Sequence, residues 1–457
     1  MPTVLQSASP NMGTDPELFI VSKTGRPRAG KRYVKATRDT KGAQIIYDNI
    51  AIELRPNPST CIAHVQDYTA VLVNEVHNKI KRAKVAHGIS LTPALKVAKA
   101  ELAMGGMEFG CSPAYNLSPY GEAHVTTPRV SPKETQVRSI GYHIHMGAEP
   151  PMTEVNRERV QAEIQEAYGY IPEYKKAITP RPKPGSYVPP SFILHDPIYR
   201  VPLIFMLDTF VGTFGIMMES YLGMRDQADQ RRNLIGYGRA SEFRTPNHGT
   251  EYRTLSSWPM MHPLLVHAAH YLSRDCLVAV ANHMQKYVLE MCPPDETADA
   301  INAGDVEGCE DIFKRAIKAY EYGVYKASGG TDIQIRVGSF LDGITPYVWL
   351  AAINTIDHRD AILQYGVDGS RRSVHKPNDP WIRRNQISPA EIKARIWNPD
   401  RIDNFFKRWD FSSHDIGCQS WAVAAKCKFN KPNLSKAATD IQKQVRAIKV
   451  PKAWDKE

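Results

Sequence analysis

Residues 241–257, SEFRTPNHGTEYRTLSS, decide the fold that we expect for this chain. The stretch contains Arg244, then a Pro-Asn-His-Gly turn, then Glu251 and Arg253 two residues apart. In a strand over residues 250–255, Glu251 and Arg253 would point to the same face, because side chains alternate along a strand. An acid beside an arginine suits a metal-bound or anionic ligand. The alternative is an edge strand in solvent with a surface ion pair, which contributes little.

Three segments upstream repeat this placement of polar or charged residues at positions i and i+2. The pairs are Asp15 and Glu17, Glu53 and Arg55, and His143 and His145. Four such strands predict a sheet with one face lined by carboxylates, imidazole and arginine, and with helices on the other face. Unpaired charges are costly in a dry core, so that face is expected to hold divalent cations and a polyphosphate. Oxygen ligands with at most one imidazole favour Mg²⁺ or Mn²⁺ over zinc.

The first two of these segments are expected to be single strands. One begins at Asp15, carries Asp15 and Glu17 on one face, and ends at the next turn. The other covers residues 43–55. Within it, Asp48 is an odd number of residues from Glu53, so it would reach the same face only through a bend or bulge between them.

Apolar periodicity and helix-end signals predict helices over residues 60–88, 93–104, 153–179, 199–222 and 258–289. The longest apolar run, residues 201–218, contains Asp208 and two glycines, so it is expected to be a buried core helix and not a membrane span. A polar stretch follows Cys292. The expected organisation is a flexible N-terminus over residues 1–12, an α+β domain over 13–292, and a mainly helical C-terminal region over 293–457.

Composition narrows the class of protein. The chain has 457 residues, of which 42% are hydrophobic and 23% charged, as in ordinary soluble proteins. The formal net charge is +10, but Lys and Arg are spread along the chain without a basic block, which argues against nucleic-acid binding. The seven cysteines include no C-x-x-C, which favours a reducing cytoplasm over disulfides or a zinc finger. The N-terminus lacks the features of a signal peptide.

Taken in order, the motifs resemble those of the phage-type COOH·NH2 ligases (type 2). They are GTDPELFI, DNIAIELRP, GCSPAYN, RSIGYHIHMG and YGRASEFRTPNHGTEYRTLSS, and the resemblance covers roughly residues 12–290. These ligases belong to the glutamine-synthetase-like amidoligases, kin of the glutamate–cysteine ligases. The resemblance implies an α+β fold with a glutamine-synthetase-like curved antiparallel sheet around ATP and two or three divalent ions, with helices packed on its convex face.

The resemblance also implies roles for individual residues. Four positions match the family's metal ligands: Glu17, Glu53, His143 and Glu251. Three arginines are candidates to bind the nucleotide: Arg244, Arg253 and Arg55. The first two of these match arginines that face the phosphate or the substrate carboxylate, and are therefore catalytic candidates as well. Two acids match polar positions of the family pattern and are candidates to take the proton of the amine: Asp15 and Asp48.

Family members are inferred to use ATP with Mg²⁺ (or Mn²⁺) to join a carboxylate to an amine through an acyl-phosphate intermediate. The implied substrates are a small-molecule or peptide acid and amine, in the cytoplasm, or in the host cytoplasm for a phage-encoded protein; a homo-oligomer is compatible. One loop departs from the family pattern. Where the family usually has two acids (G-C-D-P-D-Y-N), this chain has Ser112 and Ala114. If those acids bind the amine or a third metal, this protein uses another amine or has lost part of its activity.

Two other classes of function stay open. A metal-dependent amide hydrolase would use His143 and His145 as ligands and would not need ATP. His248, His262 and His267 follow later, but no second H-x-H or H-x-x-x-H pattern supports this class. A catalytically silent scaffold or assembly protein would keep the ligase fold and bind a partner through its C-terminal region. ATP-dependent turnover would separate the ligase from both.

Overall fold

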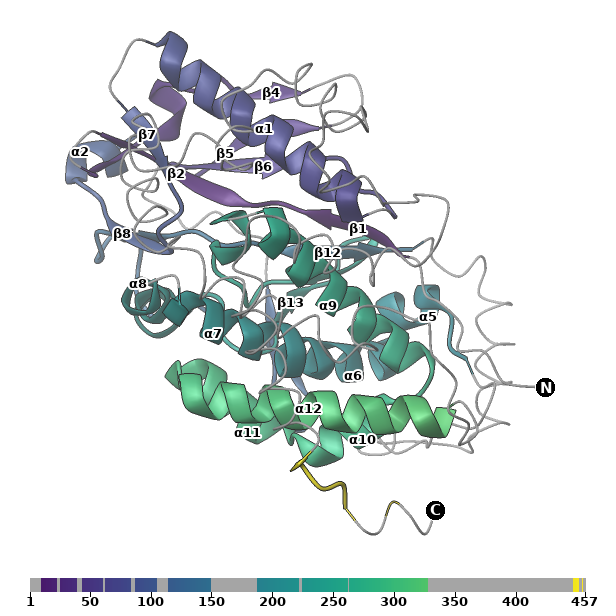
Figure 1. Ribbon diagram of the computed structural model, residues 1–457. Helices are drawn as coiled ribbons and strands as arrows, with labels where there is room; N and C mark the ends of the chain where they lie inside the picture. The colour runs from purple at the N-terminus through teal and green to yellow at the C-terminus, as the bar shows by residue number, and fades with distance from the viewer. Residues whose placement is uncertain are drawn as a thin grey trace, which may run out of the picture.

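The computed structural model describes most of the first 327 residues and a short C-terminal piece. The described residues are 10–22, 25–38, 43–60, 62–83, 87–104, 114–148, 187–221, 224–261, 263–327, 447–451 and 454. They have an α+β fold in which antiparallel sheets pack against helices (Figure 1). The helix expected over residues 153–179 and the loop residue Ser112 lie outside the described residues.

The described strands form two six-stranded sheets and one two-stranded sheet, all antiparallel. The first sheet has the order β1 (Asn11–Thr14), β12 (Ile144–Gly147), β14 (Gly249–Tyr252), β13 (Glu242–Arg244), β9 (Tyr115–Leu117), β10 (Ala123–Val125). The second has the order β3 (Pro27–Arg28), β2 (Glu17–Ser22), β6 (Ala51–Arg55), β5 (Gln44–Asp48), β4 (Thr37–Arg38), and β7 (His87–Ser90) also pairs with β2. The third consists of β11 (Val137–Ser139) and β8 (Ala94–Lys96).

The prediction of one strand from Asp15 onward is wrong, because the chain changes sheets at that point. β1 ends at Thr14 and pairs with β12, whereas β2 begins at Glu17 and pairs with β6. Pro16 separates the two strands and has no N–H with which to continue a ladder. β1 itself begins at Asn11, inside the segment that we expected to be flexible.

The prediction of one strand over residues 43–55 is also wrong. The segment is a hairpin of β5 and β6, in which Asp48 pairs with Ala51. Asn49 lies in the turn with a φ of 60°, a left-handed conformation that asparagine tolerates better than most residues. The two strands therefore fold back on each other instead of continuing in one direction.

Most of the predicted helices that lie within the described residues are present, but their ends differ from the predicted ones. In chain order they are η1 (Gly30–Arg32), α1 (Ile62–Arg82), α2 (Lys99–Leu102), α5 (Pro190–His195), α6 (Pro197–Leu207), η2 (Asp208–Gly212), α7 (Thr213–Tyr221), α8 (Arg225–Asp229), η3 (Gln230–Ile235), η4 (Trp258–Met261), α9 (Pro263–Ala281), α10 (Gln285–Met291), α11 (Pro294–Ala303) and α12 (Val306–Ala327). The helix expected over 60–88 is α1, which ends at Arg82 before the chain enters β7. The helix expected over 93–104 is instead strand β8 followed by the short α2.

Alternation along the strands sends apolar side chains toward the helices. Leu18 of β2 and Ile52 of β6 are fully buried in one core together with side chains of α1, which packs on β5 and β6. Ile144 and Tyr252 of the first sheet join the same core, where α5 and α6 pack on β14. Burying a side chain of this size contributes about 2 kcal/mol. The opposite faces of β2 and β6 carry the polar pairs together with a second, smaller core that includes Phe19 and Ala51.

The apolar helix expected over residues 199–222 is α6, η2 and α7 in continuous succession. Pro197 occupies the first turn, and the Asp196 carboxylate caps it by accepting a hydrogen bond from the N–H of Ile198 at 3.0 Å. Residues 197–220 are long and apolar enough to cross a membrane, but 94% of their most apolar window is buried inside the protein. This burial is typical of a core helix in a soluble protein.

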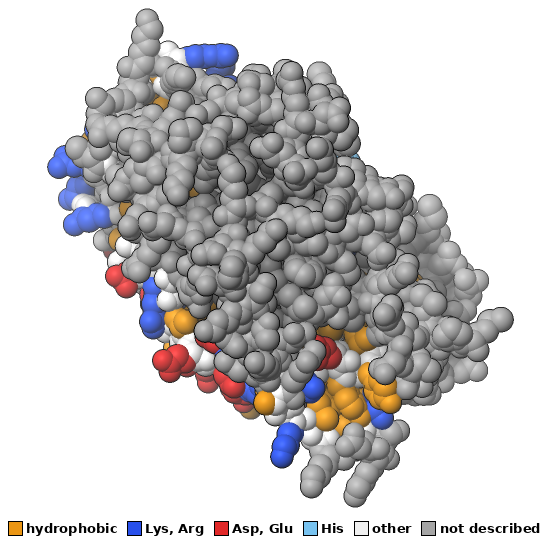
Figure 2. Space-filling model, viewed as in Figure 1, with side chains coloured by type: hydrophobic (Ala, Val, Ile, Leu, Met, Phe, Trp, Pro, Cys, Tyr) orange, Lys and Arg blue, Asp and Glu red, His pale blue; other side chains and the backbone are white. Residues whose placement is uncertain are grey.

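Helices α11 and α12 follow the boundary that we expected after residue 292. They pack on α7, α10 and η2, and they contribute Ile301 and Phe313 to the same core. Farther along the chain, Trp454 is buried against Tyr287 and Tyr322, and its indole N–H donates to Glu290 at 3.0 Å. On the face shown in Figure 2, the visible described residues present both basic and acidic side chains.

Candidate metal centre

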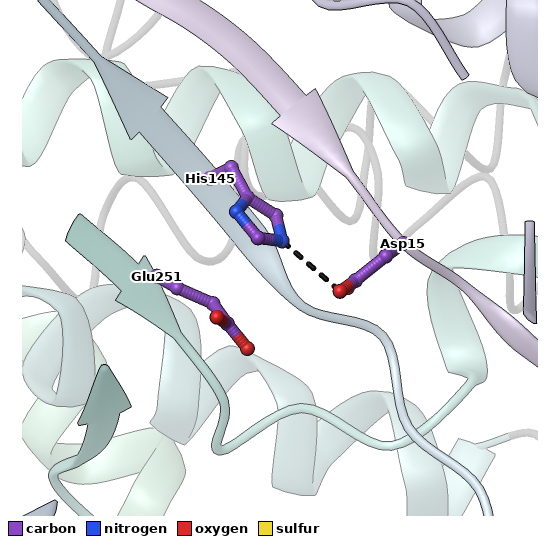
Figure 3. Close-up of side chains that lie close together, drawn as sticks. All are labelled: Asp15, His145 and Glu251. Atoms are coloured by element: carbon purple, nitrogen blue, oxygen red, sulfur yellow. Dashed lines mark ion pairs between the residues drawn. The ribbon is translucent and has the colours of Figure 1, made fainter. Parts of the chain in front are cut away.

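A first group of possible metal ligands lies on the first sheet, away from the helices. It consists of Asp15, His145 and Glu251, whose ligand atoms lie within 4.8 Å of one another. Figure 3 shows the three side chains converging from the bend after β1, from β12 and from β14. The Asp15 Oδ2 atom lies 3.1 Å from His145 Nε2.

The register of the strands produces this convergence. His145 is directly opposite Gly13 on one side and Glu251 on the other, and Glu251 is opposite Arg244. Residues that face each other across adjacent strands point to the same side of the sheet. The predicted shared face of Glu251 and Arg253 is confirmed, because the Arg253 Nη1 atom forms an ion pair with Glu251 Oε1.

A second group, made only of carboxylates, lies on the second sheet. Glu17, Asp48 and Glu53 have ligand atoms within 4.8 Å of one another. Glu17 pairs directly with Glu53 across β2 and β6, and the hairpin turn after Asp48 returns β6 alongside β5. Asp48 and Glu53 therefore share a face because of the turn, not because of a bulge. The Glu17 carboxylate also accepts a hydrogen bond from the N–H of Gly141 at 2.7 Å.

The second group holds its protons strongly. Burial raises the pKa of Glu17 well above its usual range, and repulsion from Asp48 and Glu53 raises it further. Burial also raises the pKa of Asp48. Burial and the charge of Asp15 raise the pKa of Glu53 to about 7. Three carboxylates this close together need protons or a cation between them, so their geometry and charge fit a divalent ion bound through oxygen.

Basic neighbours have the opposite effect on the first group. Burial opposes ionisation of Asp15, but His143 and His145 outweigh it and lower the pKa of Asp15 well below its usual range. Burial likewise opposes ionisation of Glu251, while Arg253 and His143 lower its pKa. Burial alone would lower the pKa of His145, but attraction to Asp15 raises it. The donor set of one imidazole and two carboxylates fits Mn²⁺ or another divalent ion that accepts both nitrogen and oxygen.

His143, which the resemblance assigns to the metal, has a different environment from His145. Its Nδ1 atom lies 2.7 Å from Asp15 Oδ1, and its Nε2 atom is hydrogen-bonded to the hydroxyl of Tyr237. The side chain is only 3% exposed, against 19% for His145. Burial and the charge of Arg253 lower the pKa of His143 to about 4. The structure thus brings both histidines to Asp15, and the Nδ1 atom of the more deeply buried His143 also lies 3.5 Å from Glu251 Oε1.

The three candidate arginines are placed differently. Arg253 is buried between two acids, with Glu242 Oε1 at 3.5 Å from its Nε atom in addition to the Glu251 pair. The Arg244 Nη1 atom lies 3.6 Å from Glu251 Oε1, and its side chain is one-fifth exposed. Arg55 is half exposed and pairs with Glu53 at 2.5 Å. Arg244 and Arg55 are therefore the arginines with surface left to meet a ligand.

A buried carboxyl group supports the strand that begins the defining stretch. Asp208, in η2 of the core helix, accepts hydrogen bonds from the N–H of Ser241 at 3.0 Å and from the hydroxyl of Tyr252 at 2.7 Å. Ser241 has a φ of 61°, which needs such support in a residue other than glycine. Burial raises the pKa of Asp208 to about 6. The core helix thus holds Ser241, the residue before β13, and Tyr252, the last residue of β14, through the same carboxyl group.

Sequence reasoning did not select three residues that the structure places at this site. Glu242 holds Arg253, Tyr237 contacts His143, and His248 Nε2 lies 3.1 Å from His145 Nδ1. Glu242 and His248 lie within the defining stretch, and Tyr237 lies between two glycines just before it, which is the one local signal that could have singled it out. Ala114, one of the two departures from the family loop, is buried beside β9.

In comparisons with known proteins, no family model, curated protein or solved structure matches the chain.

Proposed function

We propose that this protein is an ATP-dependent carboxylate–amine ligase with a glutamine-synthetase-like fold. The observation that carries the proposal is the pair of acid groups described above, with Arg244 and Arg253 beside one of them and Arg55 beside the other. Asp15 and Glu17 are two residues apart, and the charge of Asp15 raises the pKa of both Glu17 and Glu53. In this proposal the two groups act on one ligand.

The donor chemistry supports two divalent ions and a polyphosphate better than it supports an empty structural network. Glu17, Asp48 and Glu53 would hold an ion such as Mg²⁺ entirely through oxygen. Asp15, His145 and Glu251 would hold a second ion. Divalent ions held by these two groups would supply positive charge to the phosphates of ATP and to the charge that develops during phosphoryl transfer.

Residues of the chain itself would then bind and orient the substrates. Arg244 and Arg55 present partly exposed guanidinium groups that would contact phosphate or carboxylate oxygens. Arg253 is held by Glu242 and Glu251 and would stabilise negative charge from a fixed position. Asp15 and Asp48 each belong to an acid group, so in this proposal they are ligands and not the groups that take the proton of the amine.

A second candidate, a metal-dependent amide hydrolase, is favoured by one observation. His248 from the turn before β14 lies beside His145, with its Nε2 atom 3.1 Å from His145 Nδ1. Two adjacent imidazoles are a donor pair that suits zinc. This candidate leaves the all-carboxylate group and the adjacent arginines without a role, and we therefore place it second.

Isothermal titration calorimetry with a non-hydrolysable ATP analogue, with and without Mg²⁺, tests the proposal. Wild-type protein should bind the analogue only with Mg²⁺, and Glu251→Gln should lose that binding. Glu310→Gln is a matched control, because Glu310 pairs with Lys314 on the surface of α12. Zinc binding and ATP-independent amide cleavage without nucleotide binding would favour the hydrolase. A well-folded protein that binds neither metal nor nucleotide would instead be a scaffold.

A further inference from the structure

The C-terminal segment of the chain contacts the helices through one deeply buried side chain. Its described residues are 447–451 and 454, drawn in yellow in Figure 1. Trp454 is 1% exposed, and the centre of its ring lies 4.9 Å from that of Tyr287 in α10 and 5.1 Å from that of Tyr322 in α12. A tryptophan packed between two aromatic rings is typical of an anchor residue at an interface between separate parts.

Two hydrogen bonds fix the orientation of this tryptophan. Its indole N–H donates to Glu290 Oε1 at 3.0 Å, and the Tyr322 hydroxyl donates to its carbonyl oxygen at 2.8 Å. Glu290 is exposed on α10, so the apolar core does not require an acid at this position. A buried indole N–H needs an acceptor, and a carboxylate is a strong one. The tryptophan site, defined as Tyr287, Glu290 and Tyr322, therefore favours tryptophan over other apolar side chains.

The walls of the tryptophan site are held by contacts that do not involve Trp454. A Cβ atom on Gly323 of α12 would lie 3.1 Å from Met284 Cβ and 3.2 Å from Tyr287 Cδ2, so the glycine permits the close approach of α10. The rings of Tyr287 and Tyr322 meet edge to face, with centres 5.2 Å apart. Farther from the site, α10 packs on α6, and α12 packs on α7 and η2. The site is therefore formed by the helices themselves.

The segment that occupies the site is compact. The N–H of Trp454 donates to the carbonyl oxygen of Pro451 at 3.0 Å, which closes a turn. Proline fixes its own φ, so the turn loses less conformational entropy on docking. Val450 is partly buried against the core beside this turn. A few consecutive residues thus carry the contacts that a docking peptide needs.

The occupant is tethered to its own site. Helix α12 ends at Ala327, and residues 328–446 separate it from the segment. The entropic cost of closing a loop rises only slowly with its length. A tethered occupant therefore has an effective concentration at the site against which a free peptide at micromolar concentration must compete.

We propose that the tryptophan site is a recognition site for a short tryptophan-bearing segment, occupied within the chain by residues 447–454, which dock and release as a unit while α10 and α12 stay folded. The partner that fits the site is a turn that presents an indole N–H and a free backbone carbonyl. This inference goes beyond the proposed ligase function and does not depend on it.

Binding of a free peptide to the full chain tests the site. The probe is the fluorescein-labelled peptide AIKVPKAWDKE, residues 447–457, followed by fluorescence anisotropy. The full chain with Trp454→Ala should bind the peptide, and the wild type, whose site is occupied, should bind it at least roughly tenfold more weakly. Binding to neither chain, or equal binding to both, would overturn the proposal.

A pair of acid variants locates the binding within the tryptophan site. Adding Glu290→Ala to the Trp454→Ala chain should weaken peptide binding roughly tenfold, because the indole loses a charged acceptor. The matched control is Glu307→Ala, which removes an exposed acid in the first turn of α12 and should leave binding unchanged. Equal losses in the two variants would contradict the assignment.

Hydrogen exchange of the wild type, followed by mass spectrometry, needs no variant to fold. Amides of residues 447–457 should exchange at least roughly tenfold faster than those of α10 and α12, because the segment opens without the helices. A common exchange rate would overturn the proposal. Light scattering identifies the occupant: concentration-dependent dimers that Trp454→Ala abolishes would show that the segment of a second copy fills the site, against the assignment within one chain.

Discussion

Asp15 and Glu17 are separated by one residue, yet their carboxylates belong to different groups of candidate metal ligands. Asp15 lies with His145 and Glu251, and Glu17 lies with Asp48 and Glu53. The intervening Pro16 marks the point where the chain leaves the first sheet for the second. This short segment is therefore the physical link between the two groups, and each of the predictions below concerns one group or its support.

Removing the Glu251 carboxylate should weaken the fold as well as the site. Arg253 is 1% exposed and would lose its ion pair with Glu251 while keeping the longer ion pair with Glu242. Breaking a buried ion pair costs about 3 kcal/mol, so Glu251→Ala should lose about that much stability in urea unfolding. Glu251→Gln keeps an acceptor and should lose less than half of that. Equal stability of the alanine variant and the wild type would show that Arg253 does not depend on Glu251.

Substitution of His145 should affect metal binding more than substitution of its neighbour. Removing a group that orients a metal ligand typically lowers metal affinity by roughly ten- to a hundredfold. His145→Gln removes a direct ligand, so it should lower Mn²⁺ affinity by roughly a hundredfold or more. His248→Gln removes only the contact to the other ring nitrogen of His145 and should cost less in the ligase, roughly tenfold. A comparable loss for both variants in calorimetry would indicate a two-histidine centre and would favour the hydrolase.

The second group (Glu17, Asp48 and Glu53) is expected to give the free energy of unfolding an unusual dependence on pH. Glu53 keeps its proton up to a pKa of about 7 when folded, against 4.5 for an ordinary glutamate, and it faces Glu17, Asp48, Asp15 and Arg55. The folded state binds more protons in this window, so the contribution of Glu53 to stability falls as pH rises from about 4.5 to about 7.

Urea unfolding at pH 5 and pH 7.5 without divalent cations measures that contribution. Glu53→Gln should gain stability relative to the wild type as pH rises, by on the order of 2–3 kcal/mol, since one unit of pKa shift corresponds to about 1.4 kcal/mol. Added Mg²⁺ should reduce the difference by stabilising the wild type. If the difference in unfolding free energy between Glu53→Gln and the wild type did not change with pH, the raised pKa of Glu53 in the folded state would be contradicted.

Asp208 should support the site from inside the core. Its two carboxylate oxygens accept from the Ser241 N–H, the Ser241 hydroxyl and the Tyr252 hydroxyl. Asp208→Asn replaces one of these oxygens with a donor, so at least one buried donor loses its partner, at a cost of about 2 kcal/mol. Ser241→Ala removes one of the donors instead and should cost less. Thermal unfolding of the two variants measures both losses of stability. A larger loss for Ser241→Ala than for Asp208→Asn would show that the Asp208 contacts do not support Ser241.

The sequence by itself determined the properties that depend on neighbouring residues. The alternation of side chains placed Glu251 with Arg253 and Glu53 with Arg55, and the apolar periodicity located α1, the α6–α7 helix and α9. Most candidate ligands could be named in this way, because an acid, imidazole or arginine at i and i+2 is visible in the linear chain.

Only the tertiary structure decided how those residues divide between two groups. Pro16 moves Asp15 and Glu17 into different sheets, and the turn at Asn49 returns Glu53 to the side of Asp48. It also gave His143 and His145 different surroundings, because Tyr237 contacts His143 from 94 residues away in the sequence. The physical reason is that alternation is a local property of one strand, whereas strand register, turns and contacts across the core depend on residues far apart in the chain.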